Sequence, residues 1–228
     1  MPLKPMPPIP TTPLVAHIAA HVRQRFMGEG SGHDWFHIER VWRLARRIAE
    51  AEGAPLEVAE LGALLHDIAD WKFHAGDDSI GPRTARTLLE QAGAAPALID
   101  SVVDIVASIS FKGAGVATPM ASLAGACVQD ADRLDALGAI GIARCFAYGG
   151  HAGRPLYNPE DSPVLHASAE AYKAARGTSL NHFHEKLFLL KDRMNTATGR
   201  RLAEARDQFM HAFVDRFLAE WQGEDAPL

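Results

Sequence analysis

Histidine and aspartate stand side by side at the end of an apolar helical run, and this pair is the feature of the chain that most suggests chemistry. The pair is His66-Asp67, and it follows the run 61–65. A second histidine, His37, lies on the apolar stripe of an earlier helical segment, and the acidic segment 130–135 lies in a later one. Burying such groups unpaired is costly. A divalent cation such as Mn²⁺, Fe²⁺, Co²⁺, Ni²⁺ or Zn²⁺ would pair them, because these ions accept both nitrogen and oxygen ligands.

The two histidine positions each have a simpler explanation when taken alone. His37 precedes Val41 by four residues and therefore faces inward, where a core histidine bonded to a backbone carbonyl would fit as well as a ligand. A lone His-Asp pair is weak evidence, since the chain contains another, His33-Asp34, which fits a loop followed by a helix cap. Only the combination of these elements favours a metal site.

The acidic segment also leaves two interpretations open. It could be a solvated turn with an intrahelical Asp-Arg pair. Against this, Val128 and Leu134 make the segment too apolar for a fully exposed face. By helix geometry, we expect Asp132 to face the core and Asp130 and Arg133 to point elsewhere.

The elements that must position these groups are helical. Apolar residues recur at spacings of three and four, and two-residue alternation is nearly absent, so we predict an all-α fold. Thr12 and Asp34 are predicted helix caps, and Gly53 is a predicted helix end. The expected helices cover 13–26, 34–52, 55–68, 81–92, 96–109, a single or kinked stretch 120–148, 166–175, 183–194 and 202–221. The longest irregular segment, 149–163, is expected to be a lid or binding loop.

Composition indicates an ordinary soluble protein of 228 residues, with 47% hydrophobic and 22% charged residues. The first twelve residues hold five prolines, so we predict a flexible tail at 1–12 and a single domain at 13–228. The net charge of −5 gives no general attraction to nucleic acid, and no apolar stretch suits a signal peptide or a membrane span. Cys127 and Cys145 are interpreted as packed thiols, which favours the cytoplasm.

Taken together, the motifs resemble those of the HD-domain superfamily of metal-dependent phosphohydrolases. The matching segments are 37–41 (HIERV), 64–70 (LLHDIAD) and 128–135 (VQDADRLD). Two further segments, 138–144 (GAIGIAR) and 182–187 (HFHEKL), resemble a bacterial branch whose members are nucleotide pyrophosphohydrolases. The resemblance covers nearly everything after the proline-rich tail.

This resemblance implies a helical bundle around one central metal ion, with Mn²⁺ favoured and Co²⁺, Ni²⁺, Fe²⁺, Zn²⁺ or Mg²⁺ as alternatives. Asp70 matches a position where related enzymes place a carboxylate beside the attacking water. Some relatives bind more metal ions through extra histidines, but 79–129 contains no histidine, which favours a single ion. The residues at the family's ligand positions are His37, His66, Asp67 and Asp132.

The reaction implied is hydrolysis of a nucleoside triphosphate to the monophosphate and pyrophosphate. A 5′-nucleotidase, an alarmone hydrolase, a non-catalytic metal or nucleotide sensor and a structural metal site are the alternatives. The partner is thus a small phosphorylated molecule, and the aromatic-rich last helix would serve either a homodimer or the core. A polyphosphate needs further cations, although a solvated charge explains each of them equally well. The candidates are Lys72, Arg133, Lys186, Arg40 and His33.

Overall fold

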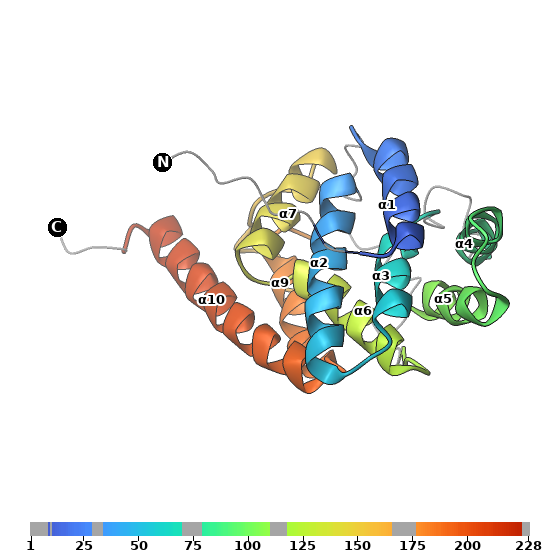
Figure 1. Cartoon of the computed structure of the whole chain (residues 1–228). Helices are drawn as coiled ribbons and strands as arrows, with labels where there is room; N and C mark the ends of the chain where they lie inside the picture. The colour runs from blue at the N-terminus through green and yellow to red at the C-terminus, as the bar shows by residue number, and fades with distance from the viewer. Residues whose placement is uncertain are drawn as a thin grey trace, which may run out of the picture.

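The computed structural model describes residues 9, 11–28, 34–69, 79–109, 118–165 and 177–224, and the regular structure in these ranges is entirely helical (Figure 1). This confirms the all-α prediction. The predicted helix at 166–175 lies outside the described residues, and the division into a tail and a single domain stays a prediction. The main helices are α1 (Pro13–Phe26), α2 (Trp35–Glu52), α3 (Leu56–Leu65), α4 (Ile80–Gln91), α5 (Pro96–Ser108), α6 (Leu123–Asp135), α7 (Gly138–His151) and α10 (Ala197–Gln222).

The first two helices begin at the caps that the sequence predicts. The Thr12 side chain accepts a hydrogen bond from the backbone three residues on, and Pro13 occupies the first turn of α1. Asp34 Oδ1 accepts from the backbone nitrogen of His37 at 2.8 Å, which fixes the start of α2. Gly53 ends α2 with a φ of 71°, a left-handed conformation that glycine adopts without strain. The cap at Asp34 therefore also orients the first turn that carries His37.

Helix α2 lies at the centre of the described structure and packs against α3 and α6 (Figure 1). Helices α4 and α5 pack on each other, and α5 contacts α3, while α7 and α10 pack together on the other side. At Gly62 a Cβ would meet side-chain atoms of Ile105 and Val128 at 3.2–3.3 Å, so α3 approaches α5 and α6 closely. Among the described helices, none has the length and apolar character needed to cross a lipid bilayer.

The stretch 120–148, predicted as one continuous or kinked helix, is instead two separate helices. Helix α6 ends at Asp135, and Leu137 is fully extended with a ψ of 159°. Gly138 then takes a φ of 71°, which a side chain would oppose. Helix α7 continues to His151, so the irregular segment starts later than the predicted 149.

The segment 181–193 is also less regular than predicted. In place of a helix over 183–194, the structure has the short helix α9 (Asn181–Glu185) and two 3₁₀ turns, η2 (Leu187–Leu189) and η3 (Lys191–Arg193). The backbone nitrogens of Asn195 and Thr196 both donate to the Asp130 carboxylate at 2.8 Å. This tertiary anchor fixes the start of α10, and the apolar spacing of the preceding segment gives no local sign of it.

Candidate metal centre

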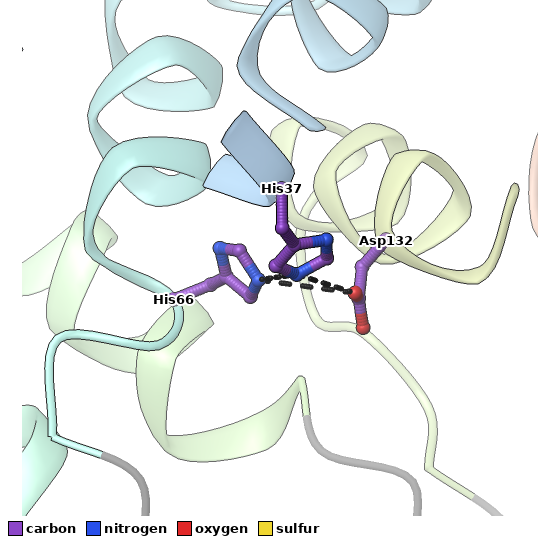
Figure 2. Close-up of side chains that lie close together, drawn as sticks. All are labelled: His37, His66 and Asp132. Atoms are coloured by element: carbon purple, nitrogen blue, oxygen red, sulfur yellow. Dashed lines mark hydrogen bonds and ion pairs between the residues drawn. The ribbon is translucent and has the colours of Figure 1, made fainter. Parts of the chain in front are cut away.

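Side chains from three separate elements converge on one point beside α2. His37 lies on the first turn of α2, His66 follows α3, and Asp132 lies on α6. The two Nε2 atoms are 3.2 Å apart, and Asp132 Oδ1 lies 3.6 Å from that of His37 and 3.8 Å from that of His66. Figure 2 shows the three side chains pointing toward one another. They form a group able to hold a metal ion.

Asp67, the remaining predicted donor, lies against both imidazoles. Its Oδ2 lies 3.4 Å from Nε2 of His37 and 3.3 Å from Nε2 of His66. Donors about 2.1 Å from one ion would be separated by about 3.0 Å in an octahedral arrangement of neighbours and about 3.4 Å in a tetrahedral one. The two imidazole nitrogens and Asp67 Oδ2 are 3.2–3.4 Å from one another, within this range, and Asp132 Oδ1 lies a few tenths of an ångström farther from both nitrogens.

Neighbouring residues His66 and Asp67 can share one ion because they lie past the end of their helix. The sequence predicts a helix through Ile68, but α3 ends at Leu65 and the next residues form turns. The Nδ1 of His66 lies 2.7 Å from the carbonyl oxygen of Ala63, which can only accept. Nδ1 of this imidazole therefore carries a proton, and Nε2, the nitrogen that can bind a metal in the neutral ring, points into the centre.

His37 is held in the same tautomer by a carboxylate. Its Nδ1 donates to Asp135 Oδ2 at 2.7 Å, which leaves the Nε2 lone pair facing that of His66. Two lone pairs at this separation repel unless a cation or a proton lies between them. Both rings are almost completely buried, with 1% and 2% of their side chains exposed, so bulk water does not relieve the repulsion. The chemistry of the donor set thus fits a divalent metal.

The Asp67 and Asp132 carboxylates make the centre negatively charged, and they lie on its solvent-exposed side. Burial lowers the pKa of His66, but the nearby Asp67 and Asp132 carboxylates outweigh it and raise that pKa to about 9. A site that binds a proton this strongly also attracts metal cations. The side chains of Asp67 and Asp132 are 17% and 34% exposed, so the carboxylate side of the centre reaches solvent.

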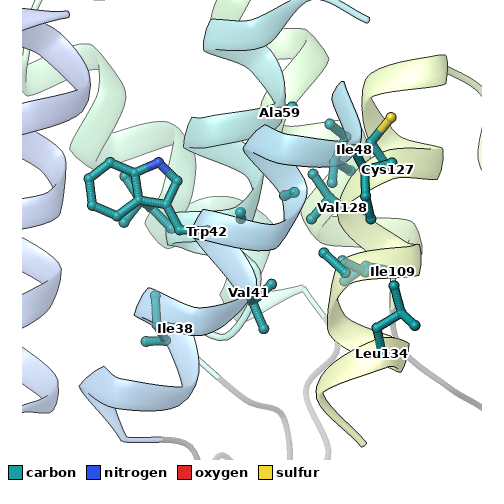
Figure 3. Close-up of a cluster of buried hydrophobic side chains, with 14 of the residues drawn as sticks. Ile38, Val41, Trp42, Ile48, Ala59, Ile109, Cys127, Val128 and Leu134 are labelled. Carbon is teal, nitrogen blue, oxygen red and sulfur yellow. The ribbon is translucent and has the colours of Figure 1, made fainter. Parts of the chain in front are cut away.

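Buried apolar side chains of α2, α3 and α6 form a core in which these helices pack together (Figure 3). Ile38 and Val41 of α2 and Leu134 of α6 are completely buried, and they flank His37 and Asp132 in the sequence. Because neighbouring side chains on each helix are held by this packing, the donors keep their directions without support from solvent.

Asp135 is the residue that sequence reasoning missed. It is buried at the end of α6 and accepts hydrogen bonds from His37, from Arg40 Nε and Nη2 and from Arg144 Nη1. Burial opposes its ionisation, but hydrogen bonds from His37 and Arg40 lower the pKa of Asp135 well below its usual range. A sequence signal existed, because Asp132 and Asp135 are three residues apart and so share a helix face.

One expectation for the acidic segment is wrong. Asp130 and Arg133 do point away from Asp132, but they are the buried residues, and Asp132, which was expected to face the core, is the most exposed of the three. Asp130 accepts from the backbone and side chains of Asn195 and Thr196. Arg133 donates to Thr118 Oγ1 at 2.8 Å and also to the carbonyl of Arg193. Tertiary contacts with distant segments bury these charges, and the local pattern does not contain them.

Of the other predicted site residues, some lie in the described structure and some lie outside it. Arg40 is bonded to Asp135 at the edge of the centre, and Lys186 is half-buried just after α9. The predicted catalytic Asp70 and the predicted substrate contacts Lys72 and His33 lie outside the described residues. Cys127 and Cys145 are free thiols, as predicted. Burial raises the pKa of Cys127 to about 12, so it is not a nucleophile at neutral pH.

Comparisons with known proteins give relatives along nearly the whole chain. YpgQ of Bacillus subtilis is 39% identical over 217 residues, which cover 92% of this chain and 94% of YpgQ. A crystal structure from Lactobacillus plantarum matches with a TM-score of 0.82 at 39% identity, covering 94% of this chain and 100% of that one. An HD-superfamily hydrolase from Bacillus thuringiensis matches with a TM-score of 0.72 at 38% identity, covering 91% and 96% of the two chains.

A structure of YpgQ in complex with ADP also matches, with a TM-score of 0.70 at 36% identity, covering 90% of this chain and 96% of YpgQ. Residues 35–137 match the HD domain family, and this range contains all four predicted donors together with Asp135. With a relative this similar over almost its full length, the chain belongs to the HD-domain family.

Proposed function

We propose that this protein is a metal-dependent phosphohydrolase that converts a nucleoside triphosphate to its monophosphate and pyrophosphate. The observation that supports it most is the approach of two buried imidazole Nε2 atoms to 3.2 Å beside two partly exposed carboxylates. One relative is named an HD-superfamily hydrolase, and YpgQ has been solved with ADP, which favours a nucleotide as the substrate.

The four donors are suited to holding one divalent metal, with Mn²⁺ as the favoured ion. When bound, such a metal lowers the pKa of a water molecule and neutralises charge developing on a phosphate. His37 and His66 supply neutral nitrogens from the buried side, and Asp67 and Asp132 supply two negative charges from the open side. These two charges balance those of the ion, so an anionic phosphate would not meet a net negative centre.

The chemistry also requires a proton acceptor and cations for the substrate. Asp70 follows Asp67 by three residues, and we propose that its carboxylate takes the proton of the attacking water. Lys72, Lys186 and His33 are proposed phosphate contacts. Arg133 is a further candidate, because its guanidinium is fixed next to Asp132 by bonds to Thr118 and Arg193. A homodimer through α10, where Phe209 and Trp221 are about half exposed, stays a prediction.

The test is a release assay with protein stripped of metal, Mn²⁺ added back and a panel of nucleotides. Pyrophosphate from triphosphates, only with metal, is the expected result. Orthophosphate from monophosphates would replace the proposal with a 5′-nucleotidase, and release only from an alarmone would replace it with that hydrolase. Metal binding without release from any nucleotide would favour a sensor.

A further inference from the structure

The buried Asp135 carboxylate accepts hydrogen bonds from two arginines and from His37 of the candidate metal centre. Its Oδ2 accepts from His37 Nδ1 and Arg144 Nη1, both at 2.7 Å, and from Arg40 Nη2 at 3.0 Å, while Oδ1 accepts from Arg40 Nε at 2.7 Å. The three partners come from α2 and α7, and Asp135 is the last residue of α6. The cluster therefore joins three helices directly behind the metal centre.

We propose that Asp135, held by Arg40 and Arg144, is a positioning residue that keeps His37 in the tautomer able to bind the metal. An ionised carboxylate only accepts hydrogen bonds, so Nδ1 must carry the proton and Nε2 must be free. Carboxylates that bind the far nitrogen of a metal-ligating histidine also fix the ring and raise its basicity. The inference rests on the metal centre of the proposed function and adds the residues that tune it.

The arginines keep this carboxylate in place as an acceptor. Arg40 binds both oxygens through its planar fork, which fixes the plane of the carboxylate, and Arg144 approaches from α7. This arrangement assigns Arg40 a different role from the phosphate contact that the sequence suggests. Its Nε and Nη2 groups both donate to Asp135, which bonds His37 through Nδ1, the ring nitrogen away from the predicted metal ligands.

The other imidazole, that of His66, is oriented by a neutral backbone carbonyl and not by a carboxylate. His66 Nδ1 donates to the backbone carbonyl of Ala63, which carries no full charge and cannot be changed by substitution. His37 is therefore the predicted ligand whose tautomer and orientation depend on a replaceable side chain. Loss of Asp135 should weaken one ligand of the four and leave the others in place.

The decisive variant is Asp135→Ala. Asp135 Oδ2 accepts from His37, Arg40 and Arg144 together, so an amide would keep its oxygen there and leave the tautomer unchanged, whereas alanine removes the acceptor. Without that acceptor the ring proton is free to move to Nε2, where the metal should bind and where it can donate to His66 Nε2, 3.2 Å away. We expect the dissociation constant for Mn²⁺, measured by calorimetry on metal-stripped protein without substrate, to rise about 10–100-fold. In ¹⁵N spectra of the stripped protein, the His37 signals should change from the Nδ1–H to the Nε2–H pattern.

Glu60→Ala is the matched control. Glu60 is an equally buried carboxylate on α3 that accepts from Trp42 Nε1 and Arg46 Nη1 of α2, so it has the same kind of partners without touching the centre. Its loss should lower thermal stability but leave Mn²⁺ affinity and the His37 spectrum unchanged. Equal loss of affinity in both variants would mean a structural effect only and would overturn the proposal, as would an unchanged His37 tautomer in Asp135→Ala.

Arg40→Gln provides a second test if the Asp135→Ala variant does not fold. A positioning role predicts weaker Mn²⁺ binding, with a smaller change than for Asp135→Ala. A higher KM for nucleotide with unaltered Mn²⁺ affinity would instead make Arg40 a substrate contact and would contradict the inference. Because these readouts need no turnover, a protein that binds metal but hydrolyses no nucleotide would fail the proposed function and leave this inference standing.

Discussion

At the scale of single residues, the centre is defined by which atoms face each other and what charge they carry. The sequence predicts the donors His37, His66, Asp67 and Asp132, because a recognisable family pattern contains them. It does not predict the role of Asp135, because the spacing from Asp132 indicates a shared helix face but does not identify the partner, a histidine 98 positions away. Direct ligands have a motif, whereas the groups that orient them are visible only once the helices are packed.

Removal of one ligand should abolish metal binding at the centre. In Asp67→Ala the remaining donors lose an oxygen that lies 3.4 Å or less from both histidine nitrogens, and the buried rings lose a counter-charge. We expect metal content, measured by elemental analysis after Mn²⁺ loading and gel filtration, to fall to background together with turnover. Asp192→Ala, on the exposed side of η3, is the control and should keep both. Full metal content in Asp67→Ala would refute the ligand assignment.

Thermal stability of the metal-free protein should depend on pH through His66. Its pKa is about 9 in the folded protein against an ordinary value of 6.5, so protonation stabilises the folded state. This contribution is complete below about pH 6.5 and is lost as the pH rises through about 9. We therefore expect the Tm of stripped protein to fall over this range, and Mn²⁺ loading to remove that part of the fall because the ion replaces the proton. Identical pH profiles with and without metal would contradict this account.

At the scale of elements, local signals set the helix starts, and tertiary contacts set the breaks. Thr12, Asp34 and Gly53 act at the positions that the sequence predicts, because capping depends on neighbouring residues only. The separation of α6 from α7 depends on the left-handed backbone of Gly138. The glycine is visible in the sequence, but the helical apolar spacing on both sides of it predicts a continuous helix. The start of α10 depends on Asp130, a partner 65 and 66 positions away from its donors.

Gly138→Ala should destabilise the protein by about 1–2 kcal/mol, because a left-handed backbone is unfavourable for a residue with a Cβ. That Cβ would also lie 3.0 Å from the Arg206 side chain, so the site offers no relief. Gly150→Ala is the matched control near the end of α7, where no atom lies within 4 Å and the backbone is helical. It should stabilise by roughly 0.5 kcal/mol. Urea unfolding measures both, and equal effects of the two substitutions would argue against a strained break.

Asp130→Ala should release the start of α10 from α6. The carboxylate accepts four hydrogen bonds at 2.7–2.9 Å from Asn195 and Thr196, and their donors would be left in a buried site. We expect a loss of about 3 kcal/mol or more in the free energy of unfolding. Hydrogen exchange should show faster exchange at the first turn of α10 than in the wild type. Unchanged protection there would mean that other contacts hold the helix start.

At the scale of the whole molecule, α2 organises the protein, since it carries His37 and packs against the two elements that bring the other donors. A bound metal would join α2, the turn after α3 and α6 at one point. Metal that binds only the folded state stabilises it by about 2.7 kcal/mol at a free concentration one hundred times its dissociation constant. Chelation should therefore lower the Tm, and the relatives that share this fold are expected to respond in the same way.

The measurement that tests the central claim most directly is turnover of a nucleoside triphosphate by stripped protein as Mn²⁺ is added in known equivalents. The account predicts no pyrophosphate before addition, a rise in proportion to bound metal, and a plateau at one ion per chain. Undiminished turnover by the stripped protein, or a plateau that requires two ions, would contradict a single catalytic metal held by His37, His66, Asp67 and Asp132.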